Sequence, residues 1–137
     1  MCTSFKREAL VGLHNFAAAG GHSFKIALFD ASVVLNETTT AYSTTGEVAY
    51  ANYTAGGFAL TKVDPSISGT VAMVTFAVNP LWIAVTFAAT QALIYNASSG
   101  NKAVAVLDFG GVQLVTAGNF GITLPAVTST TALLRIV

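Results

Sequence analysis

The chain has 137 residues, the usual size of one domain, and its single cysteine, Cys2, excludes an intrachain disulfide. Only 9% of its residues are charged, against about 25% in an average domain, and six basic side chains balance six acidic ones. This charge content argues against nucleic-acid binding, which needs clustered Lys and Arg, and favours a subunit covered by neighbours over a freely soluble monomer.

Residues 1–21 are expected to form an N-terminal helix or arm. Four apolar residues recur at helical spacing: Phe5, Ala9, Leu13 and Phe16. This spacing predicts a short amphipathic helix from Ser4 to Phe16, which ends before the Gly20-Gly21 pair. Two roles are open for it: an arm that reaches a neighbouring chain, with the glycine pair as its hinge, or a cap on its own sandwich.

Residues 22–137 are expected to form a single antiparallel β-sandwich, jelly-roll-like or immunoglobulin-like. Short apolar runs alternate with turn signals. The expected strands are Phe24–Phe29, Phe58–Val63, Thr70–Val78, Leu81–Phe87, Ala92–Tyr95, Ala103–Phe109, Val112–Val115, Phe120–Leu124 and Ala132–Val137. Between the first two, the Thr-rich stretch Asp30–Gly57 is expected to be a long irregular excursion, with at most one short element.

The stretch Pro65–Asn101 contains no charged residue and is long enough to resemble a membrane span. It is nevertheless divided by Asn79-Pro80, and its apolar residues form runs of strand length that are rich in Val, Ile and Phe. Uncharged strands therefore fit it better than a bilayer helix. We expect no contact with a membrane.

No motif in the chain indicates catalysis. His14 and His22 are the only histidines, and with Cys2 they are too few for a four-ligand zinc site. The six carboxylates are isolated from one another, and no G-x-S-x-G elbow or glycine-rich phosphate loop is present. The sequence thus predicts a non-enzymatic protein with no metal and no cofactor.

Several short segments, spread over nearly the full length, form one pattern together. They are Ser4-Phe5-Lys6, Leu10–Phe16 with His14, Phe24–Leu28, Tyr42–Val48, Tyr53–Gly57, Ala92–Asn96, Phe109–Gly111 and Phe120–Pro125. In order and spacing they resemble small structural proteins encoded among the virion genes of tailed bacteriophages. The resemblance implies a place in the virion, after assembly in the bacterial cytoplasm, and it brings no catalytic residue with it.

The charge content and the resemblance lead to one expectation of function. We expect a capsid decoration, or cement, protein that binds major-capsid subunits or other virion proteins as a homo-oligomer, with a trimer as the expected form. A tail or head–tail-junction component, including a fibre or receptor-binding module, is the alternative. A carbohydrate-binding sandwich is a third class, which would need Tyr42, Tyr50 and Tyr53 exposed together.

The interface candidates come from the apolar N-terminal segment and from the uncharged strand around Trp82. They are Phe5, Leu10, Leu13, Phe16, Trp82, Val85 and Phe87. We expect Trp82 to be buried, either in the core or under a partner subunit. We also expect the excursion Asp30–Gly57 to project or to dock on other chains.

Overall fold

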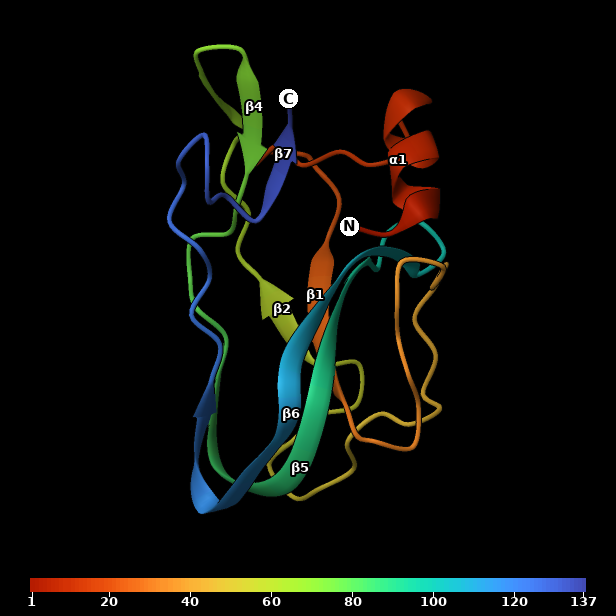
Figure 1. Ribbon diagram of the computed structural model, residues 1–137, viewed down its shortest axis with the longest axis vertical. Helices are drawn as coiled ribbons and strands as arrows, with labels where there is room; N and C mark the ends of the chain where they lie inside the picture. Colours follow the sequence, from red (N-terminus) through yellow and green to blue (C-terminus); the bar gives the residue numbers. More distant parts are fainter.

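The computed structural model describes the whole chain, Met1–Val137, which folds into one short helix and seven strands (Figure 1). The elements are α1 (Thr3–Leu10), β1 (Phe24–Phe29), β2 (Phe58–Leu60), β3 (Ser66–Ser68), β4 (Val71–Val74), β5 (Leu81–Asn96), β6 (Lys102–Gly121) and β7 (Leu134–Ile136).

The strands form two antiparallel sheets, one of four strands in the order β2-β1-β5-β6 and one of three in the order β3-β4-β7. Strand β1 lies between β2 and β5, so that Ile26 stands opposite Phe58 on one side and Ile94 on the other. The predicted all-β, sandwich-like fold with antiparallel pairing and a short N-terminal helix is confirmed.

Helix α1 ends earlier than its apolar spacing predicts. Gly12 has φ of 73°, a left-handed conformation that suits glycine. Its N–H donates to the carbonyl of Ala9 at 3.1 Å, and the N–H of Leu13 donates to the carbonyl of Glu8 at 2.9 Å. These two bonds form a Schellman motif, which satisfies the last carbonyls of the helix and turns the chain away. The predicted helix Ser4–Phe16 is therefore wrong beyond Leu10.

The long hairpin β5–β6 replaces several shorter predicted strands. Predicted strands 81–87 and 92–95 are one strand of 16 residues, and the three predicted between 103 and 124 are one strand of 20. The small residues between the predicted strands looked like loops but pair in register, with Ala88 opposite Leu114 and Ala89 opposite Gln113. Strand β3, Ser66–Ser68, lies between two predicted strands and is not predicted from the sequence.

A large bulge lies in β6 at Gly110-Gly111, where the sequence predicts a turn. The pair Ala89–Gln113 is followed by the pair Gln91–Asp108, so Thr90 alone stands opposite the four residues 109–112. Gly110, with φ of 74°, makes this extra loop of chain possible. Bulges bend and twist a strand pair. In Figure 1 the two strands curve round together at the bottom of the molecule.

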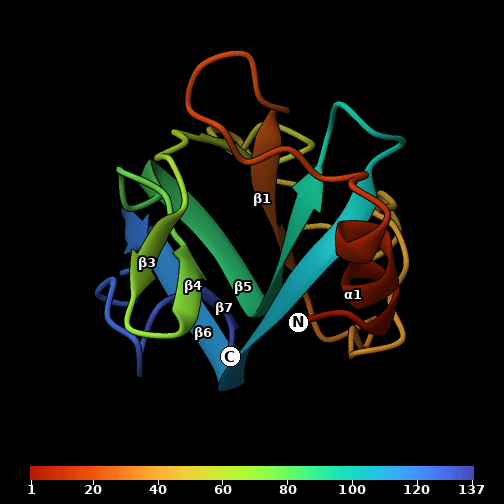
Figure 2. The same ribbon diagram turned by 90° about the horizontal axis from the view of Figure 1, so that it is seen from above.

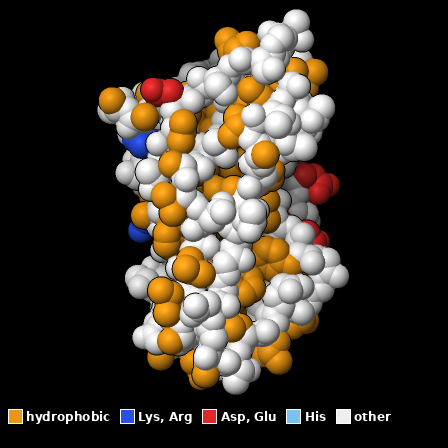
Figure 3. Space-filling model, turned by 90° about the vertical axis from the view of Figure 1, so that its left-hand side faces the viewer, with side chains coloured by type: hydrophobic (Ala, Val, Ile, Leu, Met, Phe, Trp, Pro, Cys, Tyr) orange, Lys and Arg blue, Asp and Glu red, His pale blue; other side chains and the backbone are white.

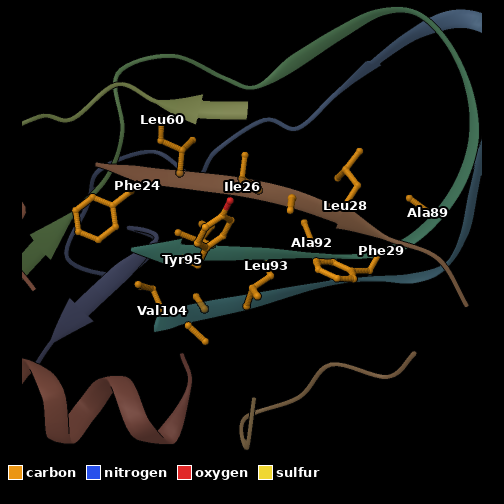
Figure 4. Packing of buried hydrophobic residues seen from close by; sticks show 14 of the residues in the cluster. Phe24, Ile26, Leu28, Phe29, Leu60, Ala89, Ala92, Leu93, Tyr95 and Val104 are labelled. Atoms are coloured by element: carbon orange, nitrogen blue, oxygen red, sulfur yellow. The ribbon is translucent and has the colours of Figure 1, made fainter. Parts of the chain in front are cut away.

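The core lies between β1, β5 and the upper part of β6. Figure 4 shows Phe24, Ile26, Leu28 and Phe29 of β1 next to side chains from the neighbouring strands. Ile26, Leu28, Leu93 and Val104 are fully buried. Both faces of the inner half of β5 are buried, because the N-terminal segment and the excursion cover the sheet on the sides that the strands leave open.

The excursion Asp30–Gly57 is irregular, as predicted, and contains no named strand or helix; it folds back over its own sheet and does not project. Gln91, buried in β5, accepts a hydrogen bond from the Leu35 N–H and donates one to the Leu35 carbonyl, both at 2.8 Å. Further along, the ring of Tyr42 stacks on Tyr95 with centroids 4.5 Å apart. A buried amide and an aromatic pair therefore attach the loop to the sheet.

Candidate interaction surface

The outer half of the β5–β6 hairpin carries no charged side chain. Residues 81–90 of β5 and 109–121 of β6 include no Lys, Arg, Asp or Glu. The adjoining face of the molecule, on the left of Figure 1, shows hydrophobic atoms along its length and very few charged atoms (Figure 3). A surface with so little charge is expected to associate with other protein.

The inward face of this half-hairpin is an aromatic cluster. The Trp82 ring lies 6.1 Å from Tyr53, 5.9 Å from Phe58 and 6.0 Å from Phe120, measured between ring centroids. Phe87 packs against Phe120 with centroids 5.2 Å apart. Trp82 is only 6% exposed, so it belongs to the chain's own core. Of the two placements expected for Trp82, the structure shows the core.

The outward face of the same strands is apolar and exposed. Ile83 is 63% exposed and Leu114 is 74% exposed, and Leu81 and Val112 are also exposed. We call these four residues the hairpin surface. The alternation of inward and outward side chains is interrupted at Ala84, where the β5–β6 register shifts between Trp82 and Val85. Trp82, Val85 and Phe87 therefore all face inward, and these three predicted interface residues are buried by their own chain. On this strand only the exposed residues remain available to a partner.

The sequence carries no signal for which of these side chains face the core. Strict alternation would place Ile83 on the same face as Val85 and Phe87, and Trp82 on the opposite face. The irregularity at Ala84 interrupts this alternation, which leaves Ile83 outside and Trp82 inside. The exposed Leu114 stands opposite Ala88, and only the pairing register reveals this neighbour.

Strand β6 is an edge strand of the four-stranded sheet, and its edge is covered along the inner half but not along the outer half. At the inner end, the Cys2 N–H donates to the Val104 carbonyl at 2.9 Å and the Ala103 N–H donates to the Thr40 carbonyl at 3.0 Å. At the outer end, no other strand pairs with the free edge. An uncovered apolar edge is a template for strand pairing with another chain.

Two alanines with positive φ shape the outer hairpin. Ala84 has φ of 52° and Ala117 has φ of 44°. Hydrogen bonds from side chains hold them there: the Ala84 N–H donates to Asn119 Oδ1 at 3.2 Å, and Asn52 Nδ2 donates to the Ala84 carbonyl at 3.0 Å. The Ala117 N–H donates to Thr86 Oγ1 at 2.8 Å. The outer hairpin therefore holds its bent form before any partner binds.

The four N-terminal interface candidates have separate positions. Phe5 is buried, and Phe16 is half-buried with its ring stacked on Phe24 at 4.3 Å. Leu13 is half-buried as well. Leu10 alone is open to a partner, at 89% exposure. In this structure the segment caps its own sheets, which is one of the two arrangements expected for it.

A buried polar network attaches the N-terminal segment to the hairpin. His14 Nε2 lies 2.9 Å from Glu8 Oε2, and Lys102 Nζ lies 3.1 Å from Glu8 Oε1. The Asn96 amide nitrogen lies 3.0 Å from His14 Nδ1 and 2.9 Å from His22 Nδ1. An amide nitrogen only donates, so both Nδ1 atoms accept, and Nε2 of His14 carries the proton that it donates to Glu8. His14 lies in the loop after the helix, although the predicted helix Ser4–Phe16 included it.

The contacts of this network fit a structural role better than a catalytic one. Burial raises the pKa of Glu8, but hydrogen bonds from His14 and Lys102 outweigh burial and lower the pKa below its ordinary value. The His14 side chain is fully buried, and neither of its nitrogens contacts a hydroxyl or thiol group. Burial raises the pKa of the Cys2 thiol, which keeps it in its unreactive protonated form. No three metal-ligating side chains come together anywhere in the chain.

The three tyrosines of the carbohydrate-binding alternative do not form an exposed platform. Tyr53 is buried, and its hydroxyl donates to Glu47 Oε1 at 2.9 Å. The Tyr42 hydroxyl donates to Glu47 Oε2 at 2.5 Å, and burial and this carboxylate raise the pKa of both tyrosines. Only Tyr50 is exposed.

The single helix, at eight residues, is too short to cross a membrane. Comparisons with models of protein families, with curated proteins and with solved structures found no match.

Proposed function

We propose that the protein is a structural component of a phage virion, a decoration protein that binds major-capsid subunits as a homotrimer. The observation that carries the proposal is the hairpin surface beside the free outer edge of β6. This half of the hairpin has no charge to oppose burial, and its backbone groups are available for pairing. The resemblance to tailed-phage structural proteins supplies the virion as the place of assembly.

The mechanism is the addition of many modest contacts. A specific protein interface buries roughly 1,000 Å² or more, and repeated contacts around a closed shell multiply the strength of each one. The aromatic cluster behind Ile83 supports this role, because a packed inner face keeps the outer face rigid and lowers the entropy cost of binding. The buried polar network keeps the opposite end of the molecule folded independently of any partner.

Sedimentation equilibrium on the isolated protein tests the first part of the proposal. The expected result is a trimer, and the change Leu114→Lys should dissociate it without loss of β structure by circular dichroism. Val34→Lys, at an apolar residue of the excursion that is 80% exposed and lies outside the hairpin, is the control and should leave the trimer intact. A single species of 14.1 kDa at high micromolar concentration would contradict self-association.

Binding to purified capsids tests the second part. A decoration protein should co-sediment with capsids that lack it, at hundreds of copies per particle. Binding at a dozen copies or fewer would point instead to a tail or head–tail-junction component. Absence from every virion fraction would contradict both roles.

A further inference from the structure

The top of the molecule carries a second surface, separate from the hairpin. Viewed from above, α1 and the small sheet that ends in β7 lie on opposite sides of the chain termini (Figure 2). Two adjoining hollows, of about 230 and 360 Å³, share Phe5 and Ala9 on one side and Arg135 and Ile136 on the other. Together they form one apolar groove, which we call the α1–β7 groove.

One wall of the groove is an unpaired strand edge. Strand β7 pairs with β4 on one side only, with Arg135 opposite Met73, and it ends the order β3-β4-β7. Apart from this pairing, no backbone hydrogen bond involves Leu134, Arg135 or Ile136. The opposite wall is the helix, which contributes Ala9 and the exposed Leu10. An open strand edge facing a helix across an apolar floor is the geometry that accepts an added strand.

The charges at the groove are all of one sign. Lys6 and Arg135 line it, and neither forms a salt bridge. Arg135 Nη1 donates only to the Ser129 carbonyl, at 2.9 Å. No carboxylate lines the groove: Glu8 is engaged by His14 and Lys102, and Asp64, near the far end, accepts from the Ala18 N–H.

We infer that the α1–β7 groove binds an extended segment of a partner protein that alternates apolar and acidic residues and pairs with the free edge of β7. Main-chain hydrogen bonds to β7 would hold such a segment in place. Alternate side chains would enter the apolar floor beside Phe5 and Ala9, while the acidic ones reach Lys6 and Arg135. The inference does not depend on the proposed virion role, because it uses a different surface and a different mode of contact.

Two fluorescein-labelled peptides test this directly, one alternating valine with glutamate and one alternating valine with lysine. Anisotropy should show binding of the glutamate peptide alone. Reversing both charges, with Lys6→Glu and Arg135→Glu, should weaken that binding about tenfold or more and give affinity for the lysine peptide. Arg7→Glu is the matched control for Lys6→Glu: it reverses one charge on the same helix but lies outside the groove, so it should have little effect.

Two further measurements separate strand addition from other kinds of binding. Ala9→Phe fills the groove from its helix wall and should abolish binding. Hydrogen exchange should show the β7 amides that face away from β4 protected only when the glutamate peptide is bound. Absence of peptide binding at millimolar concentration, or binding that Ala9→Phe leaves intact, would overturn the inference. It would also be overturned if Lys6→Glu with Arg135→Glu changed the sedimentation of the protein alone, because the groove would then be a contact between copies.

Discussion

The two ends of the β5–β6 hairpin differ in whether the backbone groups at the edge of β6 are covered. At the inner end the edge of β6 is covered by the chain itself, through Cys2 and Thr40, and the charged Glu8 and Lys102 are paired nearby. At the outer end the edge is free, its surroundings carry no charge, and Leu114 is in water. The edge of this one strand is thus covered at one end and free at the other. The comparison shows that exposure at the outer end is local, and is not a general shortage of packing.

The largest expected effect comes from charging the inward face of the outer end. Val85 is fully buried, so Val85→Lys would place an unpaired ammonium in the aromatic core. The change should cost about 3–5 kcal/mol, enough to unfold many domains of this size. Thermal unfolding followed by circular dichroism measures it.

The matched control is Ile83→Lys, two positions along the same strand and 63% exposed. Its lysine reaches water, so the stability of the monomer should be nearly unchanged while self-association is lost. If Ile83→Lys unfolded the chain and Val85→Lys did not, the assignment of the two faces would be reversed.

Removing the centre of the aromatic cluster is the next largest effect. Trp82→Ala should lower the free energy of unfolding by about 3–5 kcal/mol, because the cavity left among Tyr53, Phe58 and Phe120 has no other filler. Denaturant titration gives the value. As Trp82 is the only tryptophan, its emission in the native protein should be blue-shifted, and emission typical of exposed indole would contradict the burial.

At the inner end the expected sensitivity is to acid. The folded protein lowers the pKa of Glu8, so its carboxylate stabilises the fold above the unfolded pKa, near 4.5, and this contribution is lost as pH falls through the folded pKa. Glu8→Gln should cost about 1.5–3 kcal/mol at neutral pH, the range for hydrogen bonds to charged groups.

Denaturant titrations at a series of pH values measure this difference. The gap between the native protein and Glu8→Gln should narrow as the solution becomes acidic. Glu37→Gln, at an exposed carboxylate whose side chain makes no hydrogen bond, should leave stability unchanged at every pH. A constant gap for Glu8→Gln would show that packing, and not charge, holds this residue.

The smallest predicted effect is a gain. Ala84→Gly relieves a left-handed conformation that costs alanine about 1–2 kcal/mol, against a loss of about 0.5–1 kcal/mol for glycine in a strand. A net stabilisation of about 0.5–1 kcal/mol should appear in chemical denaturation. Ala88→Gly, in the same strand with ordinary φ, should instead destabilise. Equal effects at both positions would mean that Ala84 carries no strain.

The fold class and strand β1 could be predicted from the sequence. Phe24–Phe29 has the alternating pattern of a strand and is flanked on both sides by clear turn signals. The sequence was misleading where a local signal gave way to long-range pairing. Gly110-Gly111 looks like a turn in isolation, and only the partner strand makes it a bulge. The same limit applies to the burial of the interface candidates on β5: residues 81–88 are apolar on both faces, and the aromatic cluster that buries one set of them comes partly from Tyr53 and Phe58, far away in the chain.

The α1–β7 groove and the buried polar network had no sequence signal at all. Lys6 and Arg135 are separated by nearly the whole chain, as are His14 and Asn96 by most of it. Single polar residues at such separations carry no pattern, and their meeting depends on the sheet order. What could be predicted was the shortage of charge, which is a property of composition and not of position.

The pairing of β1 with β5 has a consequence for the timing of folding. Phe24 stands opposite Asn96 and Phe29 opposite Gln91, so the central strand of the larger sheet waits for a partner that leaves the ribosome more than sixty residues later. Until then β1, in which five of the six residues are buried in the folded protein, has only the three-residue β2 to pair with. Folds dominated by such distant pairings close in roughly milliseconds to seconds. When several ribosomes translate one messenger RNA, neighbouring nascent chains would therefore expose their β1 strands close to one another. Any dependence on chaperones during synthesis would then come from this strand and not from the hairpin surface.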